Sequence, residues 1–162
     1  MGTTIPAFRI AAILEENEWK QYKKYLDKKD RKVFSEMFSI ARLYNSACSY
    51  SSIPIRIYPI MMSIIFHHYK ILQERVDSNN VFFAKKEDNI NNKNSSIMLQ
   101  KELDKWKTYS DILRKPNRVL FNQMLQLSYK YSNAIDAKGE NHTTESLLMT
   151  LLFEQYKVLN NY

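Results

Sequence analysis

Residues 19–44, WKQYKKYLDKKDRKVFSEMFSIARLY, return in altered form 87 positions later as residues 106–131, WKTYSDILRKPNRVLFNQMLQLSYKY. The match continues outward without a gap over residues 10–75 and 97–162, and 17 of these 66 aligned pairs are identical. Repetition at one fixed spacing is the signature of a structural unit that is used more than once. The chain is therefore predicted to be a tandem duplication.

Each copy has the apolar periodicity of three helices, with apolar side chains three and four residues apart. In the first copy we expect helices over residues 6–26, from Asp30 and from Pro59. In the second copy we expect them after Ser96, from Asn117 and from Thr143 or Thr144; Ser, Asp, Asn and Thr are favoured caps and Pro is a favoured first-turn residue. The side chains predicted to pack in the core include Trp19/Trp106, Tyr22/Tyr109, Phe34/Phe121, Met37/Met124, Tyr44/Tyr131, Met62/Met149, Phe66/Phe153 and Tyr69/Tyr156.

The predicted fold class is all-α: a tandem duplication of a three-helix unit, six main helices in total, with pseudo-two-fold symmetry. Closed two-fold pairing is the commonest arrangement of two identical units, which is why we expect it here. The predicted organisation is a helical repeat over 1–76, an Asn-rich linker over 77–96 and a second repeat over 97–162, packed as one globular body. Within the linker, the apolar segment 81–83 is expected to dock on that body.

Composition excludes several classes of protein. With Gly2 and Gly139 as its two glycines, the chain cannot form a glycine-rich phosphate-binding loop. A single cysteine, Cys48, excludes an intramolecular disulfide and fits a reducing compartment. The most apolar run, residues 57–66, is about half the length that a membrane-spanning helix needs. We therefore expect a cytoplasmic protein without a membrane span.

The residues that could carry catalysis or bind a metal do not form a recognisable set. His67 and His68 are adjacent, and neighbouring helical residues point about 100° apart, so they cannot easily share one metal ion. The second copy has Glu154 at the position of His67, and the two could approach each other across a two-fold axis. Cys48 corresponds to Ile135, which favours a buried apolar role for the thiol. No enzyme, metal site or cofactor is predicted.

More basic residues than acidic residues are identical at equivalent positions of the two copies. The chain carries 24 Lys and Arg against 17 Asp and Glu, a formal net charge of +7. Clustered Lys and Arg side chains contact phosphate groups, so the candidate nucleic-acid-binding residues are Lys20, Lys28, Lys29, Arg31, Lys32, Lys107, Lys115 and Arg118. A solvated charged face, in which lysine stems cover apolar surface, is the competing interpretation.

One stretch of the first copy resembles a known family. The segments DRKVFSEM at 30–37, SACSY at 46–50 and PIMMS at 59–63 are similar to D-R-x-x-F-x-E-[MLW], S-A-[CG]-S-Y and P-[IM]-x-x-x-S in uncharacterised small helical proteins of archaea, with Ser63 one position earlier than the last pattern has it. The resemblance covers roughly residues 18–75, and the second copy departs from it, with Asn117 in place of Asp30 and Asp136 in place of Ser49. It implies an archaeal source and a helical fold, and it brings no activity.

Three functions follow as hypotheses. The first is a non-enzymatic helical interaction protein with a basic face that binds nucleic-acid backbone, or else an acidic protein. The alternative is a protein–protein adaptor or structural subunit that uses an apolar groove between the two repeats. The third is a small-ligand or metal site at the pseudo-two-fold axis, near His67 and Glu154. The oligomeric state is left open.

Overall fold

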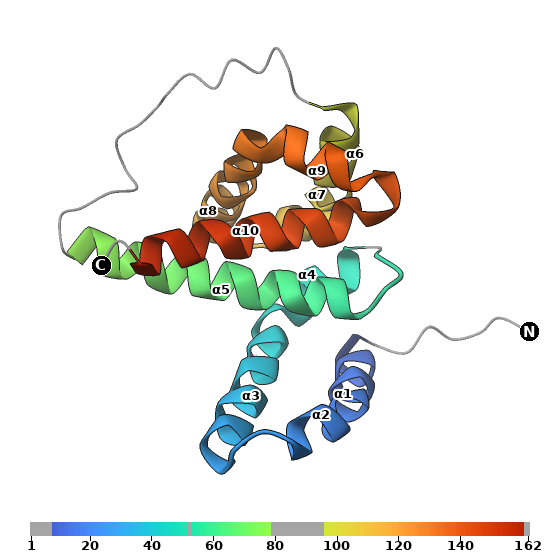
Figure 1. The fold of residues 1–162 in the computed structure, drawn as a ribbon, viewed down its shortest axis with the longest axis vertical. Helices are drawn as coiled ribbons and strands as arrows, with labels where there is room; N and C mark the ends of the chain where they lie inside the picture. Colours follow the sequence, from blue (N-terminus) through green and yellow to red (C-terminus); the bar gives the residue numbers. More distant parts are fainter. Residues whose placement is uncertain (1–7, 52, 79–95, 161–162) are drawn as a thin grey trace, which may run out of the picture.

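The computed structural model describes residues 8–51, 53–78 and 96–160 (Figure 1). Within these ranges the secondary structure is α-helix and short 3-10 helix, without any β-strand, so the predicted all-α class is confirmed. None of the helices in the described ranges is long and apolar enough to cross a membrane. The segment 81–83, predicted to dock on the body, lies outside the described residues.

The helices of the two halves follow one another in the same order. The first half contains α1 (Phe8–Glu18), α2 (Lys20–Lys24), α3 (Lys28–Ile40), a 3-10 helix (Ala41–Tyr44), α4 (Asn45–Tyr50) and α5 (Ile57–Ser78). The second contains α6 (Ile97–Lys105), α7 (Lys107–Ile112), α8 (Lys115–Gln126), a 3-10 helix (Leu127–Tyr131), α9 (Ser132–Lys138), a 3-10 turn (Glu140–His142) and α10 (Thr143–Asn160). The helices α2 and α7, α3 and α8, and α4 and α9 each begin 87 residues apart, which is the spacing of the sequence match.

Two of the expected helices in each half are interrupted. The helix predicted over 6–26 divides at Trp19, and its counterpart divides at Trp106; the ψ angles there are 1° and −4°, outside the helical range. Each indole Nε1 donates to the carboxylate four residues earlier, Trp19 to Glu15 at 3.2 Å and Trp106 to Glu102 at 3.1 Å. Glu15 and Glu102 occupy the same position in the two copies, and each accepts a hydrogen bond from the tryptophan of its own copy. The second predicted helix is divided as well, into α3 with α4 and α8 with α9, and α3 and α8 begin two residues earlier than expected.

Helix α5 lies at the centre of the molecule and is apolar on two faces. One face, with Ile60 and Ile64, packs on Ala12 and Phe38 of the first half. The other, with Met62, Ile65 and Phe66, is buried in a core that it shares with the second half. There the ring of Phe66 meets the ring of Phe121 edge-on, with 5.2 Å between the centroids. The two halves thus share one core, and the first half has a second, smaller core of its own.

The halves are joined head to tail, so the expected pseudo-two-fold symmetry is wrong. Helix α4 packs on α7, and α5 packs on α8 and α10. Among the described residues no extended contact joins α9 to α2 or α10 to α3, as a two-fold axis would require. Figure 1 shows the same relationship: α3 and α8 both rise toward the helix that follows, and α5 and α10 run side by side in the same direction. The surface that the first half uses for this contact is therefore different from the surface that the second half offers.

This arrangement leaves one set of predicted core residues outside the core. Side chains of α10 whose counterparts in α5 are buried against the second half are exposed in the structure: Met149, Leu152, Phe153 and Tyr156. Tyr22 of α2 is exposed too, whereas its counterpart Tyr109 is buried. The prediction of core packing therefore fails for Tyr22 and for these side chains of α10, because each half has a neighbour on one side. It holds in part for Trp19, Phe34 and Met37, which are partly buried and pack against the core of the first half.

Candidate interaction surfaces

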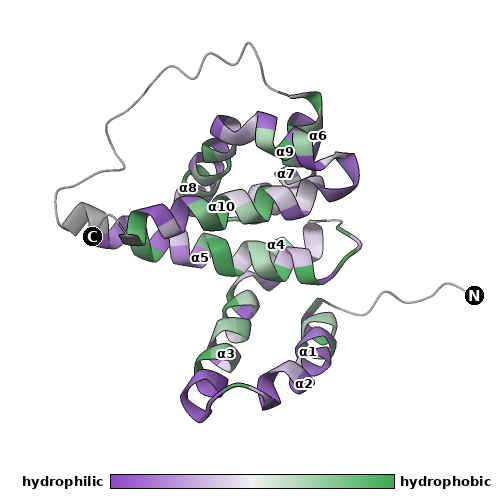
Figure 2. Ribbon diagram, viewed as in Figure 1, coloured by the Kyte–Doolittle hydropathy of each residue, from purple (hydrophilic) through white to green (hydrophobic). Residues whose placement is uncertain are grey.

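The first-half lysines predicted to bind nucleic acid gather where α2 leads into α3. This corner forms one end of the molecule and is strongly hydrophilic in Figure 2. Helix α2 carries the predicted Lys20 and also Lys24, which was not predicted, and the first turn of α3 carries the predicted Lys28 and Lys29. All four side chains are exposed, and none has an ion-pair partner among the described residues. We call these four residues the lysine corner.

Arg31 and Arg118 have a structural role that the sequence did not show. The Arg31 guanidinium donates to the backbone carbonyls of Leu26 and Lys24, each at 2.8 Å. Arg118 donates in the same way to the carbonyls of Leu113, at 3.4 Å, and Asp111. The last carbonyls of a helix lack partners within it, and a cation is favoured there. Retention of these arginines is therefore explained without a nucleic acid.

The remaining predicted basic residues differ in their surroundings. Lys32 pairs with Glu36 at 3.8 Å, between two side chains that are both largely exposed. In the second half Lys107 and Lys115 are exposed, but the positions equivalent to Lys24 and Lys29 hold Asp111 and Pro116. The second corner consequently carries less positive charge than the first.

The two basic corners are not joined into one face. The α2–α3 corner is at one end of the molecule, while α7 lies at the contact between the halves, where it packs on α4. Lys107 and Lys115 of the second half are therefore separate from the lysine corner and do not extend it. The sequence could not show this, because it depends on how the halves are stacked.

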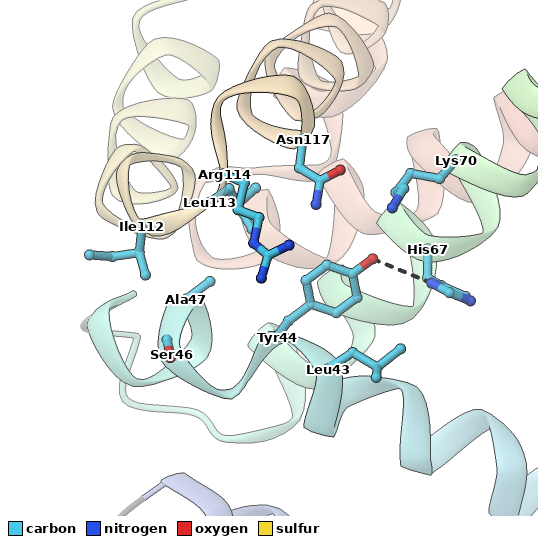
Figure 3. Close-up of a pocket in the computed structure, with 10 residues that line it drawn as sticks. All are labelled: Leu43, Tyr44, Ser46, Ala47, His67, Lys70, Ile112, Leu113, Arg114 and Asn117. Carbon is cyan, nitrogen blue, oxygen red and sulfur yellow. Dashed lines mark hydrogen bonds between the residues drawn. The ribbon is translucent and has the colours of Figure 1, made fainter.

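An open pocket of about 430 Å³ lies between the two halves (Figure 3). The first half contributes Tyr44, His67 and Lys70, and the second contributes Arg114 and Asn117. The hydroxyl of Tyr44 is 3.3 Å from Nδ1 of His67. Burial of the imidazole, and then the positive charge of Lys70, lower the pKa of His67. The sequence alone could not reveal this pocket, because its walls come from segments far apart in the chain.

The pocket does not support the metal site expected near His67 and Glu154. Glu154 is not among its lining residues; its carboxylate accepts hydrogen bonds from Tyr131 and from Lys157, the latter at 2.9 Å. Burial raises the pKa of Glu154, but these hydrogen bonds outweigh it, so the pKa lies below its ordinary value. Across the described ranges, no group of three or more His, Cys, Asp and Glu side chains could hold a metal ion.

Cys48 is buried in a small polar network at the contact between the halves. Its Sγ lies 3.1 Å from the hydroxyl of Ser63, and that hydroxyl lies 2.9 Å from the hydroxyl of Tyr109. Burial raises the pKa of the thiol to about 12. No histidine is hydrogen-bonded to it in the described structure, and a neutral thiol without a base is a poor nucleophile. The network links the halves through Ser63 and Tyr109 and has no catalytic geometry.

Comparison with known proteins adds a family and no activity. No curated protein matches the chain, and no solved structure matches it. A family model described as a domain of unknown function (DUF8156) matches residues 1–97, which is more than half of the chain. The matched range contains the whole first helical unit, α1 to α5, and stops where the second begins. The chain therefore belongs to the family of the domain of unknown function DUF8156.

Proposed function

We propose that this chain is a non-enzymatic helical interaction protein that binds nucleic-acid backbone through the lysine corner. The observation that carries the proposal is the exposure of Lys20, Lys24, Lys28 and Lys29 at one end of the molecule, with no carboxylate paired to any of them in the described structure. A reducing cytoplasm, inferred from the lone Cys48, and an archaeal source, implied by the resemblance, belong to the same proposal.

The chemistry of the corner favours phosphate over bases. Lysine ammonium groups are compact point charges that neutralise phosphates and release counterions. The corner offers no side chain that reads base edges bidentately, such as a free arginine, since Arg31 is held by the carbonyls of Leu26 and Lys24. Binding is therefore expected to be similar for all sequences and to weaken steeply as salt rises.

The test is fluorescence anisotropy with short duplex DNA, single-stranded DNA and RNA over a range of salt concentrations. The variant Lys28→Gln/Lys29→Gln should bind more weakly, and removing one phosphate contact should reduce the slope of log K against log salt by about 0.9 on duplex DNA. The matched control is Lys101→Gln/Lys138→Gln, which removes the same charge from exposed positions of the second half. Equal binding by both variants and the wild type would contradict the proposal and favour an acidic protein as the partner.

A protein–protein adaptor is the second candidate, on a different observation. The groove between the repeats, where the alternative hypothesis placed the partner, is largely filled by α4 and α5 packing on α7, α8 and α10. Exposed apolar side chains also occur away from this groove, among them Met149 and Phe153 of α10 and Tyr22 and Val33 of α2 and α3. An adaptor could therefore use these exposed faces of α10 and of α2 and α3.

A further inference from the structure

The contact between the two halves has an unfilled equivalent on each half, one on α10 and one on α2 and α3. Inside the chain, α4 packs on α7, and the buried face of α5 packs on α8 and α10 and reaches Tyr109 of α7 through Ser63. The same repeat positions on α10 form what we call the α10 face: Met149, Leu152, Phe153 and Tyr156. The positions that correspond to the receiving surface of α7 and α8 form what we call the α2–α3 face: Trp19, Tyr22, Val33 and Phe34.

Burial distinguishes the occupied surfaces from the open ones. Met62 and Phe66 of α5 are both 0% exposed, whereas Met149 and Phe153 of α10 are 66% and 49% exposed. On the receiving side, Tyr109 is 0% exposed and Tyr22 is 54% exposed. The open faces thus carry the residue types that make the internal contact, in the same order, and several of these side chains are far more exposed than their counterparts.

A stack of repeated units that ends in solution normally presents a polar outer face at each end. In this chain the lysine corner is polar, but Tyr25 and Val33 beside it, and Met149 and Leu152 on α10, are large, apolar or aromatic, and exposed. Burial of such side chains stabilises a contact, and contiguous exposed apolar surface commonly marks an interaction site. Each half therefore presents a face with the character of an interface.

We propose that a second copy of this chain covers these faces, with the α10 face of one molecule docked on the α2–α3 face of the next. The internal contact supplies the geometry. The Phe66–Phe121 ring contact corresponds to Phe153 against Phe34 of the neighbouring molecule. The Ser63–Tyr109 hydrogen bond corresponds to Thr150 with Tyr22 of the neighbouring molecule.

Such a contact is heterologous, since it joins two different surfaces. A heterologous contact leaves one face of each kind open at the two ends of a linear assembly. The assembly therefore continues to grow as a chain of molecules, unless it closes into a ring. It does not depend on the lysine corner. Lys107 and Lys115 stay exposed although α7 and α8 are covered, so their counterparts Lys20 and Lys28 would stay exposed in the assembly.

The test is sedimentation velocity of the full chain over a range of concentrations. The wild type should rise above its monomer mass of 19.3 kDa as concentration increases. Met149→Glu should abolish the rise by blocking the α10 face, and Tyr22→Glu by blocking the α2–α3 face. Val119→Lys is the matched control, because Val119 is also exposed and the equivalent position naturally holds Lys32. Circular dichroism of each variant establishes that the helices are intact.

Mixing the two face variants distinguishes head-to-tail docking from other modes of association. Met149→Glu retains an intact α2–α3 face, and Tyr22→Glu retains an intact α10 face. The mixture should therefore form a one-to-one dimer and stop there, while each variant alone stays monomeric. A wild type that remains monomeric up to its solubility limit overturns the proposal. So does a Tyr22→Glu variant that still associates with itself, because that result shows association without the α2–α3 face.

Discussion

Arg31 and Arg118 make the same contact in the two halves, each donating to the last backbone carbonyls of the short helix that precedes its own. Arg31→Ala should therefore lower the free energy of unfolding by about 1–2 kcal/mol, the usual scale for removing hydrogen bonds from a charged donor. Chemical denaturation measures the change. Lys28→Gln, at an exposed position nearby, should change it by less than about 0.5 kcal/mol. Equal effects of the two substitutions would show that Arg31 does not hold the α2–α3 turn.

Met62 and Met149 occupy the same repeat position in opposite surroundings, which allows an internally controlled experiment. Met62→Ala removes a fully buried side chain and should cost about 2–5 kcal/mol of unfolding free energy. Met149→Ala removes an exposed one and should cost less than about 0.5 kcal/mol when measured on dilute protein. Urea denaturation of the two variants gives the comparison. Similar costs would mean that Met149, like Met62, is buried within a single molecule.

The thiol of Cys48 should report on opening of the contact between the halves. Its pKa of about 12, raised by burial, leaves almost no thiolate at neutral pH, and the side chain is shielded from reagents. Labelling by a thiol reagent should therefore be slow in the native protein and fast in denaturant. Ser63→Ala removes the hydroxyl that links Cys48 and Tyr109 across the contact between the halves. Because this contact should then open more often, the native variant should be labelled faster. Rapid labelling of the native wild type would contradict the described burial.

Two histidines on α5 should make the fold sensitive to mild acid. Burial lowers the pKa of His67 and of His68 below the ordinary value of 6.5; Lys70 adds to the effect on His67, and His67 adds to the effect on His68. Below pH about 6.5 the unfolded chain binds more protons than the folded chain, so the free energy of unfolding falls as the pH decreases through that region. Thermal or chemical denaturation between pH 8 and pH 5.5 measures the slope.

The control for this pH dependence is His67→Gln/His68→Gln. Glutamine fits the fold at the second position, because the equivalent residue of α10 is Gln155. Its Nε2 donates to the backbone carbonyl of Ile65 at 2.7 Å. The double variant should flatten the slope between pH 7 and pH 5.5. An unchanged slope would assign the pH dependence to other groups.

Sequence alone could predict the helices but not how the halves are stacked. The spacing of Trp19, Tyr22 and Leu26, repeated 87 residues later, is enough to place helical segments and to pair their positions. The divisions at Trp19 and Trp106 were missed, since no Pro or Gly marks them. Local periodicity carries no information on which unit a buried side chain meets.

The third helix of each half shows why symmetry was predicted wrongly. In α5 both Ile60 and Met62 are buried, on faces that meet different halves of the molecule. In α10 the equivalent Leu147 is buried and Met149 is exposed. The sequences of the two helices are alike, so only the three-dimensional stacking decides which face is covered. The lysine corner could be found from charge density, whereas the structural role of Arg31 could not.

Joining the two halves in one polypeptide changes how the head-to-tail contact depends on protein abundance. A single half would have to find its neighbour by diffusion, and the occupancy of the contact would follow concentration. Within this chain the α5 contact is tethered, so its effective concentration is set by the connection between the halves. That contact forms at any dilution. Docking of a second copy on the α10 face would be a contact between separate molecules, so its occupancy would rise and fall with the amount of protein in the cell.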